Sequence, residues 1–266
     1  MTKIGFIGAG NMGSALARAA AQAENTELYI YDKDEKKAKA LAKDIGGAYL
    51  TNKEIAKTCN YIFMAVKPNI VALAAAEIKD IIKDRCDCAI VSMAAGVSIA
   101  SIEEAFSGAN APIIRIMPNT PAAVGCGMTV FSKNGKVTDA LYEEFVRIMA
   151  KSGELDAIPE SLIDAASAVS GCGPAFVYMF IEALADGGVE CGLPREKSLA
   201  YAAQTLLGAA EMLKESGKHP GELKDAVCSP GGSTIAGVHA LESGAFRATA
   251  QSAVVAAYKK TLTLGK

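Results

Sequence analysis

Six residues near the N-terminus have the spacing G-x-G-x-x-G, which is typical of a loop that binds the phosphates of a nucleotide. The loop follows an apolar segment, Lys3–Gly8, that predicts a strand, and a helix of small residues begins within it. The glycines permit a tight turn, close approach to a pyrophosphate and close helix–strand packing, and the helix N-terminus adds unpaired N–H groups. We therefore expect a dinucleotide here, although a glycine-rich turn without a ligand has the same pattern. The expected contacts are Gly8, Gly10, Asn11, Met12 and Gly13.

Asp32 comes about 20 residues after this loop, at the end of a second predicted strand, Glu27–Tyr31. A carboxylate at that position accepts hydrogen bonds from the ribose hydroxyls of NAD and repels the 2′-phosphate of NADP. Lys33, Lys36 and Lys37 follow, and their charges either offset that repulsion or belong to a solvated helix face. The sequence therefore favours NADH, with Lys33 as a further cofactor contact, and leaves NADPH open.

Three later strand ends consist of small or rigid residues, and ligands of an open α/β sheet bind beyond such carboxyl ends. Small side chains admit the nicotinamide ribose close to the backbone, and Asn119 offers it a hydrogen bond. The alternative explanation for each segment is an ordinary loop that binds no ligand, because such residues are common in loops and turns. The three segments are Ala65-Val66-Lys67-Pro68, Ala94-Ala95-Gly96 and Pro118-Asn119-Thr120-Pro121.

A second cluster of main-chain donors is predicted at Ser229-Pro230-Gly231-Gly232-Ser233-Thr234, where a helix begins. Two glycines beside hydroxyl side chains at a helix start form a nest of N–H and O–H donors, which suits a carboxylate. The alternative is a capped helix start with Ser229 or Ser233 as the N-cap. The first interpretation predicts a substrate site for a small acid.

Groups for other kinds of catalysis are scarce in this sequence. Its two histidines are His219, which precedes a proline, and His239, which lies within a predicted helix and which we expect to be structural. Carbonyl reduction needs a proton donor for the developing alkoxide, whereas an iminium already carries its charge and leaves a neutral amine. Hydride delivery to a C=N bond therefore depends mainly on positioning. The seven cysteines are scattered; the closest pair, Cys86 and Cys88, lacks the spacing of a zinc site, and we expect no metal.

The elements that must position these residues divide the chain near residue 159. Before that point, short apolar runs alternate with helical patterns, which predicts a Rossmann-type α/β domain over residues 1–159. After it, the pattern is helical throughout, which predicts an all-helical domain over residues 160–266. The helix expected at Glu196–Lys214 is so apolar that it must pack against other helices or a second subunit.

Composition narrows the class of protein. The net charge is −2 and 51% of the residues are hydrophobic. We therefore expect a globular chain without the positive electrostatic field that would attract nucleic acid or an anionic membrane. Met1 leads directly into the first strand, and the cysteines fit reduced thiols, so we expect a cytoplasmic location. The uncharged stretch Ala165–Ile181 approaches the length of a membrane span. Because Gly171-Cys172-Gly173-Pro174 predicts a break in it, we expect a buried helix pair there.

With these motifs the chain resembles the pyrroline-5-carboxylate reductase family over nearly its whole length. The most specific segment is His219–Thr234, which is similar to the signature of that family. The other matching segments are Gly5-Phe6-Ile7-Gly8-Ala9-Gly10-Asn11-Met12, Ala65-Val66-Lys67-Pro68, Ala94-Ala95-Gly96-Val97, Met117-Pro118-Asn119-Thr120-Pro121 and Ser170-Gly171-Cys172-Gly173-Pro174-Ala175.

The resemblance implies an enzyme that reduces 1-pyrroline-5-carboxylate to L-proline with NAD(P)H, the last step of proline biosynthesis. It places the substrate carboxylate on the backbone and hydroxyl of Ser229 and on the main-chain N–H groups of Gly232 and Ser233, with Gly231 as a further substrate-binding residue, and it places the Thr234 hydroxyl near the ring nitrogen. Ser229 and Thr234 are thus the expected catalytic residues. Glu160 matches a position near the substrate, and Asn52 matches a cofactor contact. The second domain is then the substrate-binding and dimerisation domain of a homodimer, and such dimers often assemble into rings.

Two residues depart from the family pattern. Cys172 stands where serine is common, and Ala226 stands where some members have a polar cofactor contact. Two alternatives also remain at this point. A β-hydroxyacid dehydrogenase has a similar plan but requires a lysine after the domain boundary, and residues 162–185 contain none. A dinucleotide-binding redox sensor would bind NAD(P)H without turnover, but it gives the Ser229–Thr234 segment no role.

Overall fold

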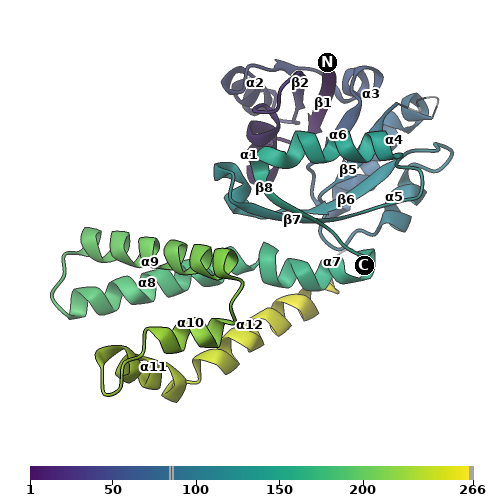
Figure 1. Ribbon diagram of the computed structural model, residues 1–266. Helices are drawn as coiled ribbons and strands as arrows, with labels where there is room; N and C mark the ends of the chain where they lie inside the picture. The colour runs from purple at the N-terminus through teal and green to yellow at the C-terminus, as the bar shows by residue number, and fades with distance from the viewer. Residues whose placement is uncertain (84, 86, 264–266) are drawn as a thin grey trace. The chain divides into compact units, whose positions relative to one another are not determined.

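The computed structural model describes residues 1–83, 85 and 87–263 (Figure 1). Cys86, half of the predicted C-x-C pair, and residues 264–266 of the predicted second domain lie outside these residues. Chain contacts separate two compact units, of which the first contains Met1–Cys172 together with the residues from Ala256 onward, and the second contains Gly173–Val255. The division differs from a boundary near residue 159 because Ile163, just beyond that point, is buried against Met117 and Val130 of the first unit.

The first unit is built on one eight-stranded sheet in the order β3-β2-β1-β4-β5-β6-β7-β8. The strands from β3 to β6 in this order are parallel, β7 is antiparallel to β6, and β8 is parallel to β7. This is the doubly wound arrangement that the alternating pattern predicts, and the Rossmann-type prediction is confirmed. The strands are β1 (Thr2–Ile7), β2 (Thr26–Tyr31), β3 (Ala48–Tyr49), β4 (Tyr61–Met64), β5 (Ala89–Ser92), β6 (Ile113–Met117), β7 (Gly127–Lys133) and β8 (Gly153–Ala157).

Helices cover both faces of this sheet, and side chains that alternate along the strands fill two cores. In β4, Tyr61 and Phe63 point into one core, and Ile62 and Met64 point into the other. Phe63 stacks on Phe6 of β1 with a centroid distance of 4.5 Å. The helices of this unit are α1 (Asn11–Ala20), α2 (Glu35–Asp44), α3 (Asn52–Thr58), α4 (Val71–Ile82), α5 (Ile99–Ala105), α6 (Asp139–Met149) and α7 (Glu160–Ala166).

The sequence did not predict β3 and α3. The strand β3 has only two residues, which is too short for an alternating pattern to be recognised. The helix α3 has seven residues, but it begins with a capping box in which Thr51 and Glu54 bond each other's backbone N–H groups. That sequence signal, T-x-x-E, was available and identifies the helix that carries Asn52.

We expected the uncharged stretch Ala165–Ile181 to form a buried helix pair with a break, and the structure shows that this prediction is wrong. A π-helical segment at Ser167–Gly171 leads into α8 (Gly173–Glu190), so that helical structure extends from Glu160 to Glu190. This helix is long and apolar enough to cross a membrane by length and composition alone, and only 11% of its most apolar window is buried.

The second unit has almost no core of its own. It contains α8, most of α12 and three further helices. Within it, α8 packs against α9. Among its described residues only Ala185, Ser198 and Ala202 are buried. Large side chains such as Met179 and Tyr201 are instead 70% and 56% exposed, which is unusual for a monomer. The helices are α9 (Arg195–Ser216), α10 (Pro220–Ala226), α11 (Ser233–Ser243) and α12 (Phe246–Thr261).

Candidate functional site

The loop between β1 and α1 has the geometry that its glycines predict. Gly8 has a φ of +110°, and a Cβ there would lie 2.3 Å from the carbonyl oxygen of Ala65. A Cβ on Gly13 would lie 2.5 Å from the carbonyl oxygen of Gly8. A side chain at either position would therefore force β1, α1 and the end of β4 apart. A Cβ on Gly10 would meet nothing within 4 Å, so open space lies where a pyrophosphate is expected.

The helix α1 presents its first N–H groups to this open space. Gly10 is the N-cap of α1, and no side chain accepts a hydrogen bond from the first turn. The first turn also contains no acidic residue. The unpaired N–H groups and the positive end of the helix dipole therefore suit a phosphate.

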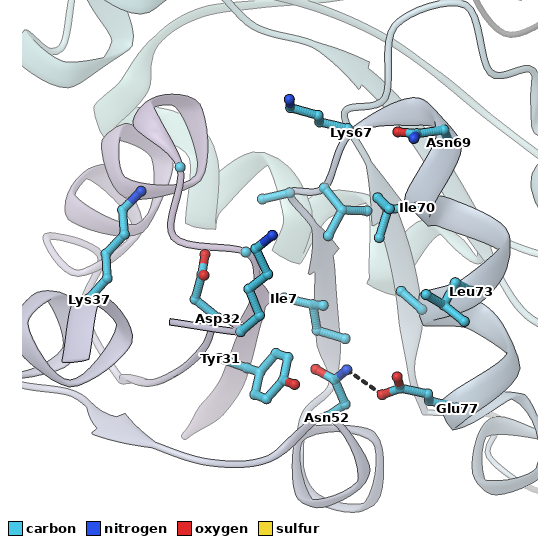
Figure 2. A pocket seen from close by; sticks show the side chains of 16 residues that line it. Ile7, Tyr31, Asp32, Lys37, Asn52, Lys67, Asn69, Ile70, Leu73 and Glu77 are labelled. Atoms are coloured by element: carbon cyan, nitrogen blue, oxygen red, sulfur yellow. Dashed lines mark hydrogen bonds between the residues drawn. The ribbon is translucent and has the colours of Figure 1, made fainter. Parts of the chain in front are cut away.

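A cavity of about 610 Å³ lies beside the loop at the carboxyl ends of β1, β2 and β4 (Figure 2). It brings together eight of the residues predicted to bind the cofactor: Gly8, Gly10, Asp32, Lys33, Asn52, Ala65, Val66 and Lys67. The other eight do not line it, namely Asn11, Met12, Gly13, Pro68, Ala94, Ala95, Gly96 and Asn119. The cavity wall also contains residues that the sequence analysis did not assign to it: Ile7, Tyr31, Lys37, Asn69, Ile70, Leu73, Ala74 and Glu77.

Asp32 connects the second strand to the glycine loop. One carboxylate oxygen accepts a hydrogen bond from the N–H of Ala9 at 2.7 Å, and the other accepts one from the N–H of Asp34 at 3.0 Å. Each oxygen retains a second lone pair, so the carboxylate can still accept a ribose hydroxyl. Lys33 and Lys37 line the same cavity, whereas Lys36 does not.

Asn52 is held at the other end of the cavity. Its side-chain amide donates a hydrogen bond to the carboxylate of Glu77 at 2.6 Å, and the residue is only 6% exposed. Its oxygen, Oδ1, is buried and has no hydrogen-bond partner. Tyr31 lies nearby, and burial raises the pKa of its hydroxyl, with a further contribution from the negative charge of Glu77. The wall here therefore combines a neutral phenol, a carboxylate and an unsatisfied amide oxygen.

Glu160 belongs to an ionic cluster in the first unit, in which a buried arginine pairs with two half-buried carboxylates. Its carboxylate accepts hydrogen bonds from the N–H of Ile99 at 2.6 Å and from the guanidinium of Arg115 at 3.1 Å. Arg115 also pairs with Asp164 at 2.6 Å, and its side chain is 4% exposed. The cluster joins the start of α5, just after the Ala94–Gly96 strand end, to the start of α7. Glu160 is therefore a fixed carboxylate, and its predicted place beside the substrate stays a prediction.

Asn119 uses its side chain on the protein itself. The amide N–H₂ donates to the carbonyl of Ser170 at 2.9 Å, and the amide oxygen accepts the N–H of Met128 at 2.9 Å. These bonds tie the end of β6 to β7 and to the π-helical segment. The structure thus gives Asn119 a structural role, and its predicted bond to the nicotinamide ribose stays a prediction.

The Ser229–Thr234 segment forms a tight turn in the second unit. Gly231 has a φ of +69°, and the N–H of Gly232 donates to the carbonyl of Ser229 at 3.0 Å. Gly232 is the N-cap of α11, and no side chain caps that helix. The alternative prediction, with Ser229 or Ser233 as the N-cap, is therefore wrong. Both serines and Thr234 are exposed, so this helix start presents uncapped N–H groups beside hydroxyls.

His219 has a structural role, and Cys59 and Cys88 are buried thiols. His219 is the N-cap of α10, and its Nδ1 accepts the N–H of Gly221 at 3.1 Å. Burial raises the pKa of the Cys59 and Cys88 thiols to about 12, so both remain protonated and unreactive at neutral pH. Within residues 1–83, 85 and 87–263, no group of three His, Cys, Asp or Glu side chains is placed to hold a metal ion.

The sequence analysis did not identify Arg115 or Glu77, although the sequence around Arg115 contains a signal for it. Arg115 lies within the apolar strand Ile113–Met117, and a charge in a buried strand must find a partner, which predicts an ionic cluster. Glu77 lies on a helix among other charged residues and has no comparable signal. Its contact with Asn52 joins α4 to α3, which are 25 residues apart at that point.

The first unit therefore fits a nicotinamide dinucleotide on three independent observations. There is open space at Gly10, an uncapped N-terminus on α1, and an unsatisfied amide oxygen on Asn52 at the far end of the same cavity. Phosphates, ribose and base each have a partner of suitable chemistry along this wall.

Comparison with known proteins accounts for both parts of the chain. Residues 3–96 match the family model described as NADP oxidoreductase coenzyme F420-dependent, and residues 160–264 match that described as pyrroline-5-carboxylate reductase dimerisation. The pyrroline-5-carboxylate reductase of Pisum sativum is 41% identical, covering 98% of this chain and 95% of its own. That of Escherichia coli (strain K12) is 41% identical, covering 99% and 98%. A crystal structure of Plasmodium falciparum pyrroline carboxylate reductase with NADP bound is 37% identical with a TM-score of 0.89, covering 100% and 98%.

Proposed function

Because the chain belongs to the pyrroline-5-carboxylate reductase family, we propose that it reduces the C=N bond of 1-pyrroline-5-carboxylate to give L-proline. One observation carries this proposal: relatives of that activity match at 41% identity over 98% of the chain, across both the dinucleotide cavity and the helical unit. The chain is an oxidoreductase with a site for a nicotinamide dinucleotide. These findings favour the reductase over the β-hydroxyacid dehydrogenase and the redox sensor.

In this mechanism the protein contributes mainly positioning. The bound dinucleotide, when reduced, supplies the hydride. Gly10 and the uncapped start of α1 hold the pyrophosphate, and Asp32 accepts the ribose hydroxyls. Asp32 favours NADH, while Lys33 and Lys37 line the same cavity and offer charge to a 2′-phosphate, so NADPH also remains a substrate to be tested.

The substrate acid is assigned to the start of α11. The N–H of Ser233 lies at an uncapped helix N-terminus, which favours a carboxylate, and Gly231 and the Ser229 hydroxyl belong to the same turn. The N–H of Gly232 is bonded to the Ser229 carbonyl in this turn, so its contact with the substrate is assigned on the resemblance alone. We place the Thr234 hydroxyl beside the ring nitrogen, where its oxygen accepts a hydrogen bond from the N–H of the protonated iminium. Glu160 is assigned to the substrate on the resemblance alone. The iminium carbon carries its charge before the hydride arrives, so the reaction needs no strong acid.

The helical unit carries the dimerisation domain of the family, and we assign its exposed apolar side chains to the interface of a homodimer. This assignment also gives the apolar Glu160–Glu190 helix a protein partner. Further assembly into a ring and the cytoplasmic location stay predictions.

The test is a two-cofactor assay with one substrate. Purified full-length protein is mixed with 1-pyrroline-5-carboxylate and either NADH or NADPH, and the loss of reduced-nicotinamide absorbance is followed together with the formation of L-proline. We expect proline to form in step with cofactor oxidation. Binding of the reduced cofactors without oxidation of either NADH or NADPH in the presence of the imine would contradict the proposal and favour the sensor.

A further inference from the structure

Asn52 contains a buried hydrogen-bond acceptor that the folded chain leaves unused. The residue is 6% exposed, it lines the dinucleotide cavity, and its Oδ1 has no partner. Leaving such an atom unpaired is unfavourable, because the buried oxygen has lost its hydrogen bonds to water and gained none in return. A buried acceptor on a cavity wall therefore indicates a ligand that brings a donor.

The orientation of this amide is determined by chemistry. Glu77 Oε2 lies 2.6 Å from the Asn52 amide nitrogen, and an ionised carboxylate can only accept a hydrogen bond. The N–H₂ group must therefore face Glu77, and the oxygen must face the other way. Figure 2 shows the amide oxygen on the side of Tyr31, away from Glu77. A backbone that is itself fixed by the Thr51–Glu54 capping box carries the side chain.

The base of the dinucleotide belongs at this end of the cavity. The pyrophosphate position is set by Gly10 and the ribose position by Asp32, so the base lies farther along the same wall. The apolar side chains of Ile70 and Leu73 lie along the wall that ends at Asn52 and Glu77 (Figure 2). Ala74 lines the same cavity. A flat apolar base with one polar edge fits such a surface.

We propose that Glu77 orients the Asn52 amide so that its oxygen accepts a hydrogen bond from the exocyclic amino group of adenine, which selects adenine over a 6-oxo purine. Adenine offers an N–H₂ donor at that edge. Hypoxanthine has a carbonyl there, which faces Oδ1 acceptor to acceptor. The Asn52 oxygen then stays unpaired, and the base gains a repulsive contact. The inference rests on the proposed dinucleotide site and adds a positioning role for Glu77.

Without the Glu77 carboxylate, the side-chain amide of Asn52 can rotate by 180° and exchange the positions of its oxygen and nitrogen. The neutral side-chain amide of the variant Glu77→Gln can either accept from or donate to Asn52, so both orientations of the Asn52 amide are satisfied. The turned amide offers N–H₂ to the hypoxanthine carbonyl. The variant therefore gains affinity for the hypoxanthine dinucleotide, and general damage to the site does not produce a gain.

The experiment measures binding with the full-length protein and no substrate. The fluorescence of the reduced nicotinamide is titrated with NADH and with reduced nicotinamide hypoxanthine dinucleotide, for the unmodified chain and for Glu77→Gln, Asn52→Ala and Asp80→Asn. Asp80 is an exposed acid on the same helix that does not line the cavity, so its variant is a matched control for lost charge. The ratio of the two dissociation constants cancels effects on folding and on the rest of the site.

We expect the unmodified chain and Asp80→Asn to bind NADH about 10- to 100-fold more tightly than the hypoxanthine dinucleotide. In Glu77→Gln and Asn52→Ala the ratio should fall close to one. Equal binding of the two dinucleotides by the unmodified chain would overturn the inference, and it is the result expected if the Tyr31 hydroxyl already satisfies Oδ1. A ratio in Glu77→Gln as large as in the unmodified chain would overturn the role of Glu77. Both outcomes leave the reductase assay unaffected, so the proposed function is tested separately.

Discussion

Replacing Asp32 tests how the chain distinguishes NADH from NADPH. Asp32→Asn removes the charge but keeps an amide oxygen that can accept the N–H of Ala9, as the carboxylate does at 2.7 Å, and it gives up only the bond from the N–H of Asp34. The turn of the glycine loop is therefore retained, and the change reports on charge. Asp32→Ser removes the charge and also the reach to Ala9, so comparing the two variants separates electrostatics from loop geometry.

The size of the effect follows from Coulomb's law. A 2′-phosphate at about 5 Å from the carboxylate, with an effective dielectric constant of about 20 to 80, is repelled by roughly 1–3 kcal/mol per unit of its charge. A phosphate monoester carries about 1.5 to 2 negative charges, and salt reduces the total. For NADH, a charged acceptor becomes a neutral one, which costs about 1 kcal/mol. NADPH should thus gain at least about tenfold and NADH lose about fivefold, since 1.4 kcal/mol is a factor of about ten.

The assay is kcat/KM for each cofactor at saturating imine, measured at low and at physiological salt. We expect the NADPH/NADH ratio to rise by about 50-fold or more in Asp32→Asn, and to rise more at low salt. If the ratio changes by less than about threefold, the carboxylate does not face the 2′ position. Selection would then be assigned to Lys33 and Lys37.

Three further changes test other parts of the structure. Thr234→Ala should lower kcat by about 10- to 1,000-fold while the dissociation constant of NADH stays the same; an unchanged kcat would remove the hydroxyl from the mechanism. Arg115→Met leaves the Glu160 and Asp164 carboxylates without their cation and should lower the free energy of unfolding, measured with urea, by about 1–3 kcal/mol, because both carboxylates keep partial access to water; an unchanged midpoint would show that the ion pairs add no net stability. A thiol reagent at pH 8 should label the exposed Cys126 and Cys191 but not Cys59, whose thiol has a pKa of about 12 because it is buried; labelling of Cys59 in the native protein would contradict this.

The parts of the site that the sequence predicted depend on local spacing. The interval between Gly8, Gly10 and Gly13 reflects one turn and the start of one helix, so it can be recognised without knowledge of the rest of the fold. Asp32 was placed in the same way, by its distance from that loop and by the end of a strand. The structure puts Gly8, Gly10 and Asp32 on one cavity wall, together with Ala65 and Val66 from the neighbouring strand.

The parts that escaped prediction are contacts between distant elements. Glu77 on α4 bonds Asn52 on α3, and Arg115 on β6 bonds Glu160 and Asp164 on α7, and no periodicity in the sequence encodes either pairing. The prediction for Asn119 shows the opposite difficulty. A polar residue at a strand end has the sequence pattern of a ligand contact. Here its side-chain amide instead forms hydrogen bonds with the backbone of Ser170 and of Met128, and so joins the end of β6 to two other segments.

Folding of the helical unit is tied to association, and the burial pattern shows why. Five helices that bury only Ala185, Ser198 and Ala202 among their described residues in this unit remove too little apolar surface from water to offset the entropy of ordering the chain. Met179 and Tyr201 are among the side chains that the proposed homodimer would cover, and the family match identifies this part of the chain as a dimerisation domain. Since the Ser229–Thr234 turn belongs to this unit, we expect its geometry to depend on the proposed dimer interface. Dilution below the dissociation constant of the dimer should consequently weaken the substrate turn while the Gly8–Gly13 loop, which rests on the sheet, persists.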